Sequence, residues 1–178
     1  MTPVLLVLAG AITLGDVYGA ISIDAGYAQS TSTEADASVE SVVVGASAEV
    51  GIEVRERFHG TLIAWGLPFV SPSVRDDPDA EVDTSLFGAG LGVLFGLDDG
   101  WFVGGALCAL LQPQSGFTLG TDSGDIGGAV VLRGGRLWSV SGPLHLGVEA
   151  RAIYGQVDAF ATRWNPASAT VSLLVAID

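Results

Sequence analysis

The sequence predicts an all-β fold, an eight-stranded antiparallel up-and-down transmembrane β-barrel. Three observations lead to this prediction. Apolar residues recur at every second position, which is the period of a strand with two different faces. The connections between these segments are alternately short and long. Charged residues make up only 15% of the chain, well under the roughly 25% that is usual for soluble domains.

The composition limits the class of protein. A length of 178 residues fits one domain or at most two small ones. A hydrophobic content of 49% excludes disorder, and 25 glycines argue against long helices. The net charge is −13 and all seven basic residues are arginine, so the surface would repel nucleic acid. The single Cys108 excludes an intramolecular disulfide and a cysteine-rich zinc site.

The N-terminal segment differs from the rest of the chain. Residues 3–14 form an apolar run that is too short for a membrane-spanning helix of about 20 residues, but has the length of a signal-peptide core. No basic residue precedes the run, and a first β-strand is the alternative interpretation. A ninth strand would break the even strand number of such barrels. We therefore expect residues 1–15 to be a signal peptide or its remnant and residues 16–178 to be the barrel.

The first half of the barrel domain contains four predicted strands. Residues 21–27 place Ile21 and Ile23 on one face and Ser22 and Asp24 on the other. Residues 44–52 set a face of Val, Ala and Ile against one of Gly, Ser and Glu49. Residues 57–67 are apolar on both faces and are a weaker prediction. Residues 87–95 oppose large apolar residues to glycines, which allow tight curvature in a strand.

The second half contains four more. Residues 100–111 are apolar on both faces, and residues 125–135 alternate weakly. Residues 144–154 alternate most clearly, with His145, Glu149 and Arg151 opposite a face of Leu, Val, Ala and Tyr. Residues 167–177 again oppose apolar residues to Ser and Thr. Strands of this length are long for globular proteins but suit a tilted crossing of a bilayer, which takes about 9–11 residues.

The connections fall into two classes. Short ones lie at residues 55–56, 98–100 and 139–143, and long polar ones at 30–38, 71–84, 112–124 and 158–165. Outer-membrane barrels have short periplasmic turns and long outer loops. The pattern therefore predicts four outer loops, of which the one around residues 75–83 is the most acidic.

The two faces of the strands have different roles in this interpretation. The apolar face would contact lipid, and the face of Gly, Ala and Ser would line a narrow lumen. Aromatic residues near predicted strand ends would form the two interfacial girdles: Tyr18, Tyr27, Phe58, Phe87, Phe95, Trp101, Trp138, Tyr154 and Trp164. The alternative is a soluble lipocalin-like barrel or sandwich, in which the faces are inverted and a lumen could hold an apolar ligand.

Five charged residues fall on the face assigned to the lumen: Asp24, Glu49, Arg133, Glu149 and Arg151. Buried ions are costly unless they are paired. Two arginines and three carboxylates can form a network of ion pairs that closes the interior. A narrow pore is the alternative, although eight strands leave little room for water.

The chain resembles the small eight-stranded outer-membrane β-barrel proteins of Gram-negative bacteria. The resemblance rests on a glycine-rich strand FGAGLGV at 87–93, a tryptophan strand WFVGG at 101–105, and the hairpin RLWSVSGPLHLGV at 136–148. It extends from about residue 16 to the C-terminus. It implies this fold and a location in the bacterial outer membrane.

Motifs for chemistry are scarce. His145 and Glu149 share a face but lie about 13 Å apart along a strand, and no nucleophile is identified by spacing. The acidic stretch 76–83 could collect Ca²⁺, but it lacks the glycine and the final glutamate of an EF-hand loop, and a solvated acidic loop is the favoured interpretation. Glycines 88, 90 and 92 do not form a dinucleotide fingerprint. We therefore expect no catalytic residues, no cofactor and no resident metal.

The function expected from the sequence is that of an outer-membrane β-barrel with a packed lumen and a structural or surface-interaction role. The partners expected are outer-membrane lipid and a surface ligand bound through the acidic loops, with the protein itself a monomer. A narrow pore and a soluble barrel that binds an apolar ligand are the alternatives.

Overall fold

A computed structural model describes residues 17–177, apart from residues 33, 35, 76–82, 116–124 and 160–161. It contains eight long strands, one two-residue strand and one 3₁₀ turn, η1 (Asp98–Gly100). The strands are β1 (Val17–Ser32), β2 (Ala37–Arg55), β3 (Phe58–Val74), β4 (Asp83–Gly96), β5 (Trp101–Gln112), β6 (Gln114–Ser115), β7 (Asp125–Ser141), β8 (Leu144–Ala159) and β9 (Thr162–Ile177). Within the described residues, no helix is long and apolar enough to cross a membrane.

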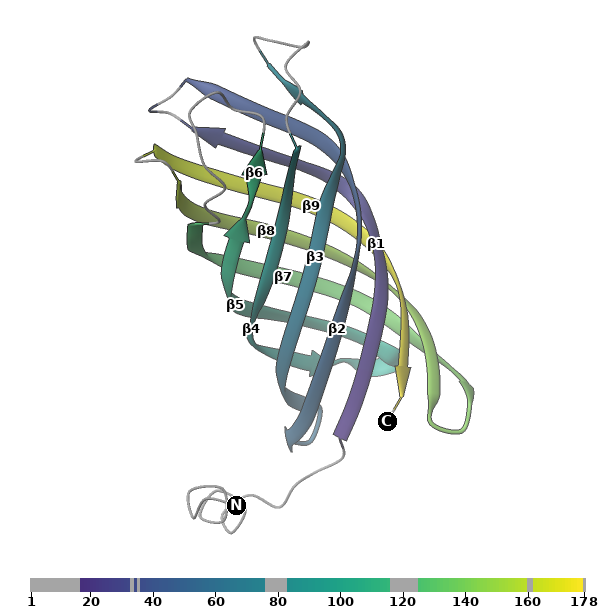
Figure 1. The fold of residues 1–178 in the computed structure, drawn as a ribbon. Helices are drawn as coiled ribbons and strands as arrows, with labels where there is room; N and C mark the ends of the chain where they lie inside the picture. The colour runs from purple at the N-terminus through teal and green to yellow at the C-terminus, as the bar shows by residue number, and fades with distance from the viewer. Residues whose placement is uncertain are drawn as a thin grey trace, which may run out of the picture.

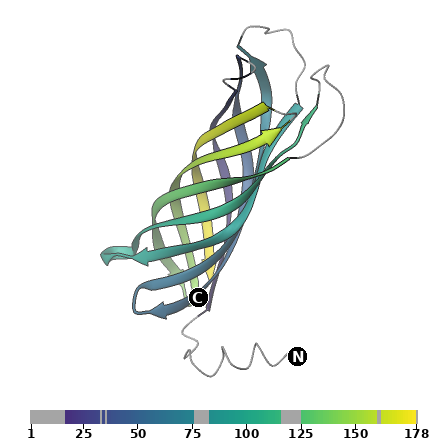
Figure 2. The ribbon, with the colours of Figure 1, turned by 90° about the vertical axis from the view of Figure 1, so that its left-hand side faces the viewer.

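The long strands form a closed ring in which every neighbouring pair is antiparallel. The order is β3-β2-β1-β9-β8-β7-β5-β4, and the pairing of β4 with β3 closes the ring (Figures 1 and 2). β6 pairs with the first residues of β4 in the same register as β5, and Pro113 separates the two because it has no N–H to donate. The predicted eight-stranded up-and-down barrel is confirmed.

The ends of the barrel differ as the sequence predicts. Short connections join β2 to β3, β4 to β5 through η1, and β7 to β8, all at the end where β1 begins and β9 finishes (Figure 1). We call this the turn end, and the opposite end the loop end. In outer-membrane barrels the short turns are periplasmic and the long loops lie outside the cell.

Two of the four expected long loops are wrong. Residues 30–38 and 158–165 lie largely within strands, because β1 reaches Ser32 before β2 begins at Ala37, and β8 reaches Ala159 before β9 begins at Thr162. Residues 30–38 are mostly Ser, Thr and acidic residues, and residues 158–165 mix polar residues with Phe160 and Trp164, so neither segment shows a clear alternation although the ladder of backbone hydrogen bonds continues in the strand residues. A ladder satisfies backbone N–H and C=O groups whatever the side chains are.

The outer surface is apolar along every long strand. Large side chains on it are exposed: Ile21, Val44, Leu62, Leu91, Leu107, Leu132, Leu146 and Val171 belong to β1, β2, β3, β4, β5, β7, β8 and β9 in turn. A continuous apolar exterior of this extent is a membrane-contacting surface. The same surface argues against the soluble barrel, which would turn its apolar face inward.

Candidate functional site in the barrel lumen

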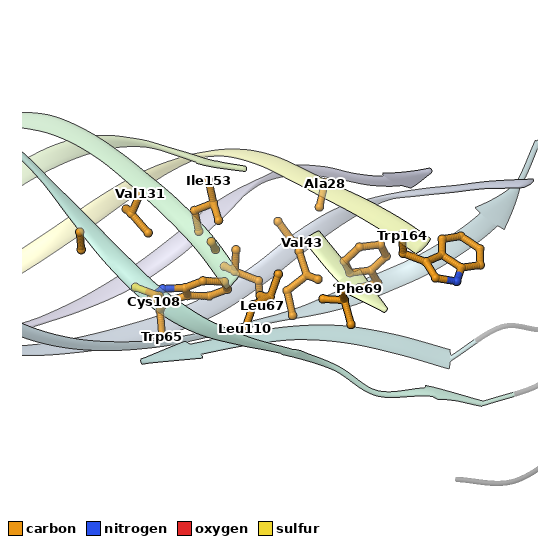
Figure 3. Close-up of a cluster of buried hydrophobic side chains, with 14 of the residues drawn as sticks. Ala28, Val43, Trp65, Leu67, Phe69, Cys108, Leu110, Val131, Ile153 and Trp164 are labelled. Carbon is orange, nitrogen blue, oxygen red and sulfur yellow. The ribbon is translucent and has the colours of Figure 1, made fainter. Parts of the chain in front are cut away.

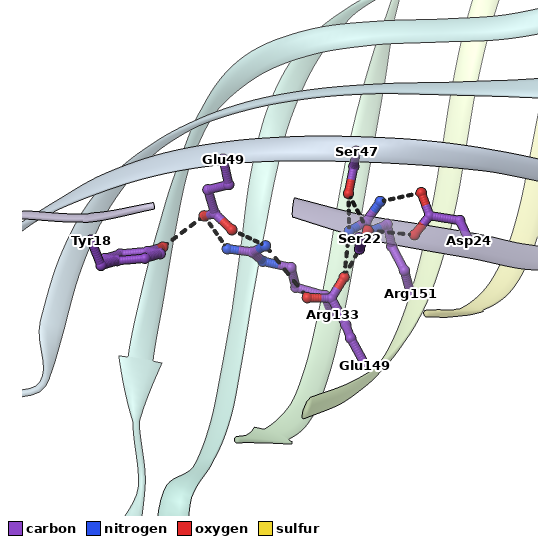
Figure 4. A network of polar contacts seen from close by, with 8 residues as sticks. All are labelled: Tyr18, Ser22, Asp24, Ser47, Glu49, Arg133, Glu149 and Arg151. Atoms are coloured by element: carbon purple, nitrogen blue, oxygen red, sulfur yellow. Dashed lines mark hydrogen bonds and ion pairs between the residues drawn. The ribbon is translucent and has the colours of Figure 1, made fainter. Parts of the chain in front are cut away.

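The five charged residues assigned to the lumen come together inside the barrel. Their exposed fractions lie between 0 and 7% of their surface, so all five are buried. We call them the charge cluster: Asp24 on β1, Glu49 on β2, Arg133 on β7, and Glu149 and Arg151 on β8 (Figure 4). Three carboxylates and two guanidinium groups give the cluster a formal charge of −1.

Arg133 links opposite walls of the barrel. Its two terminal nitrogens donate to the two carboxylate oxygens of Glu49, with the Nη1–Oε2 distance at 2.5 Å. β2 and β7 are not neighbours in the ring, so this bidentate pair crosses the lumen. Tyr18 donates its hydroxyl to the same Glu49 carboxylate at 2.8 Å. Bidentate arginine–carboxylate pairs are the strong form of this interaction.

Glu149 resolves a conflict between like charges. Arg133 on β7 and Arg151 on β8 are direct cross-strand partners. Two like charges in this position repel each other and destabilise a sheet. The Glu149 carboxylate lies between them, with Oε2 3.5 Å from Nη1 of Arg133 and Oε1 2.6 Å from Nη2 of Arg151. One carboxylate therefore bridges both guanidinium groups.

Asp24 and two serines complete the cluster on its other side. Arg151 Nη1 lies 3.5 Å from Asp24 Oδ2, and Arg151 Nη2 donates to Ser47 Oγ at 3.0 Å. Ser22 donates to Asp24 Oδ1 at 2.7 Å, and the hydroxyls of Ser22 and Ser47 are 2.6 Å apart. The cluster thus joins β1, β2, β7 and β8 through one continuous set of polar contacts (Figure 4).

Sequence reasoning missed the polar partners Tyr18, Ser22 and Ser47. It placed Tyr18 in an interfacial girdle, but the structure puts its hydroxyl on Glu49 inside the lumen. The sequence also places Trp164 in a girdle, but its side chain is buried inside the barrel. Parity along the strand is the signal that could have found both: Tyr18 shares the face of Asp24, and Trp164 shares the face of Ser168 and Thr170.

An apolar layer fills the lumen on the loop-end side of the charge cluster. On each strand that carries a cluster residue, the buried apolar residue lies further toward the loop end: Ala28 beyond Asp24, Val43 beyond Glu49, Val131 beyond Arg133, and Ile153 and Val157 beyond Arg151. Trp65, Leu67, Phe69, Leu86, Cys108, Leu110 and Trp164 belong to the same packed cluster (Figure 3). The lumen is therefore blocked by two successive layers.

The inward faces of β3 and β5 supply much of this apolar layer. These are the two segments that the sequence shows as apolar on both sides. The strand β4, which lies between β3 and β5, has glycines on its inward side. A Cβ atom at Gly88 would lie 2.3 Å from the ring of Trp65. The glycine face of β4 thus provides the space that Trp65 occupies.

The turn-end side of the charge cluster is less filled. A cavity of about 160 Å³ is lined there by residues that include Tyr18, His59, Phe102, Leu137 and His145. His145 and Glu149, which the sequence places on one face, both border this cavity. The structure brings no group of three His, Cys, Asp or Glu side chains together for a metal among the residues it describes. The acidic stretch 76–83 lies outside the described residues except for Asp83.

The comparisons with known proteins concern the fold. Neither a protein-family model nor a curated protein sequence matches the chain significantly. The crystal structure of Neisserial surface protein A aligns with a TM-score of 0.62 at 16% identity, over 89% of this chain and 96% of that one. Two structures of Ail, the attachment invasion locus protein of Yersinia pestis, align with TM-scores of 0.45 and 0.47 at 13% identity, over 88% of this chain and 98% of theirs.

The neighbour with a TM-score of 0.62 is an eight-stranded barrel of a Gram-negative outer membrane. Its likeness covers nearly the whole of both chains and agrees with the closed antiparallel ring and the apolar exterior described above. The chain has the fold of the eight-stranded transmembrane β-barrels of the Gram-negative outer membrane.

Proposed function

We propose that this protein is a closed, monomeric β-barrel of the outer membrane with a structural or surface-interaction role. The observation that carries the proposal is the double block of the lumen by the charge cluster and the apolar layer. A channel needs a continuous aqueous path, and two packed layers oppose one. The complete ring also leaves no unpaired edge among the eight long strands for strand addition, which supports the monomer.

The surface role is supported by the loop end of the barrel. Acidic residues gather in the sequence of this end, with Asp76, Asp77, Asp79, Glu81 and Asp83 in one connection. Arg163 is paired there with Asp158 at 3.2 Å, and its backbone N–H donates to Glu34 at 3.1 Å. We infer a partner of positive charge, because a strongly acidic end attracts cations and basic surfaces. We infer no catalytic activity and no cofactor.

Protein recovered from the outer-membrane fraction is expected to shift in electrophoretic mobility when it is boiled in SDS. In a closed ring every long strand is paired on both sides, so no strand edge has unpaired backbone groups. We therefore expect the barrel to stay folded in SDS at room temperature. A soluble protein whose mobility is unchanged by boiling would contradict the membrane assignment.

We also propose that residues 1–15, which lie outside the described residues, are removed as a signal peptide. The intact mass of the recovered chain would test this.

Conductance measurements in planar bilayers separate the closed barrel from the narrow pore. The wild-type protein is expected to give no steady ionic current, and Arg151→Ala is expected to remain closed because the apolar layer still blocks the lumen. The comparison uses the same lipid with an open porin as a positive control. A steady current in the wild type that changes in size or ion selectivity with Arg151→Ala would favour the pore.

A further inference from the structure

A second arginine environment lies on the outside of the barrel at the turn end. Arg136 on β7 shares the outward face of Trp138, two residues along, and its direct cross-strand partner on β5 is Trp101. The exposed fractions of the two tryptophan side chains are 50% for Trp101 and 45% for Trp138. Both therefore face the membrane side rather than the lumen. Tryptophan in this position marks the level of the lipid headgroups.

The two indole rings and one carbonyl hold the Arg136 guanidinium. Its central carbon lies 5.5 Å from the ring centroid of Trp101 and 5.6 Å from that of Trp138, within the range of cation–π attraction. Its Nε donates to the backbone carbonyl of Asp99 at 3.1 Å. These contacts hold the guanidinium beside the two indole rings.

Within the part of the chain that the structure describes, Arg136 Nε is the only guanidinium nitrogen of this residue with a protein acceptor. Among the described residues, the ion pairs at the turn end join Arg57 to Asp98, and none includes Arg136. At a lipid interface, the remaining N–H groups of such an arginine can donate to water or to an anionic group from outside the chain. The planar fork of arginine binds phosphate oxygens in a bidentate manner, which lysine cannot do.

We propose that Arg136, Trp101 and Trp138 form a binding site for the phosphate group of a phospholipid in the leaflet at the turn end. The lipid phosphate accepts from the two terminal nitrogens, and the indole rings pack beside the upper part of the acyl chains. The site depends on the membrane-spanning fold and is independent of whether the lumen conducts, so a current through the lumen leaves it standing.

Lipid titration of the detergent-solubilised full chain, read by native mass spectrometry, tests the site. The probe is phosphatidylglycerol, and diacylglycerol with the same acyl chains is the phosphate-free comparison. Wild-type protein is expected to bind phosphatidylglycerol more tightly than diacylglycerol. Arg136→Gln is expected to weaken phosphatidylglycerol binding about tenfold, since a hydrogen-bonded charged partner contributes on that order.

The matched control is Arg57→Gln, which removes an exposed arginine at the same end that has no flanking tryptophan and is already paired with Asp98. It is expected to leave phosphatidylglycerol binding unchanged, while both variants keep the mobility shift on boiling. Equal loss in the two variants, or full binding by Arg136→Gln, overturns the proposal. Inorganic phosphate that bound with equal affinity and the same dependence on Arg136 would assign the site to free phosphate and also overturn it.

Discussion

Replacing Arg133 by methionine is expected to destabilise the folded barrel by about 3–5 kcal/mol, the cost of removing one partner from a buried ion pair. The side chain of Arg133 is almost wholly enclosed and is paired with both Glu49 and Glu149. Its loss changes the formal charge of the cluster from −1 to −2 and leaves two carboxylates facing each other without the guanidinium between them. The cluster then contains more buried charge than its remaining arginine can neutralise.

Urea unfolding of the protein in lipid vesicles measures this change in the free energy of unfolding. Arg163→Met is the matched control, because Arg163 makes a single exposed ion pair with Asp158, a type worth about 0–1 kcal/mol. The double variant Glu49→Leu/Arg133→Met restores the formal charge of −1 and is expected to recover part of the loss. If Arg133→Met cost no more than Arg163→Met, the charge cluster would not be a buried structural element.

Replacing Val171 by arginine is expected to destabilise the barrel by about 2–4 kcal/mol, the cost of arginine on the lipid face at the bilayer midplane. Val171 is 63% exposed on the outer face of β9. Val171 lies midway between Ala167 and Val175 on β9. Ala167 pairs with Tyr154 on the loop-end side, and Val175 pairs with Leu146, which is the partner of Trp138 on the turn-end side. An arginine there cannot reach either interface without distorting the bilayer.

A depth series on one face of β9 provides the internal control. Arginine at Leu173, Val175 and Ile177 is expected to cost progressively less than at Val171, falling to about 0–1 kcal/mol near the interface. All four side chains are exposed on the same face. The free energy of unfolding in vesicles is again the measurement. A flat profile within about 0.5 kcal/mol is what surface substitutions in a soluble protein give, and it would contradict the membrane assignment.

Much of the fold could be predicted because strands impose a period of two on their sequence. Ile21 and Ile23 alternate with Ser22 and Asp24, and the structure places the first pair outside and the second pair inside. The prediction of strand ends is weaker where the two faces of a strand do not differ in polarity. The extensions of β1, β2, β8 and β9 toward the loop end mix polar residues with apolar ones such as Val39, Val157 and Trp164, so no regular alternation marks them as strands.

The apolar layer was less predictable than the charges. Residues 57–67 and 100–111 carry apolar side chains on both faces, so parity alone does not say which of them fill the lumen. Trp65 and Leu110 are buried inside, whereas Leu62 and Leu107 are exposed outside. The residues of β3 and β5 that fill the lumen are those on the same side of the sheet as the glycines of β4 and the inward residues of β7. The pairing of the strands sets this side.

The sequence by itself determined the number of long strands, the set of charged residues that point inward, and the lipid-facing residues of those strands whose two faces differ, because local alternation separates the two faces. Only the tertiary structure decided which of those charges meet. Glu49 and Arg133 are 84 residues apart and lie on strands that are not neighbours in the ring. Their contact across the lumen exists because β3 pairs with β4 and closes the ring, and ring closure is a property of the whole chain that no local pattern contains.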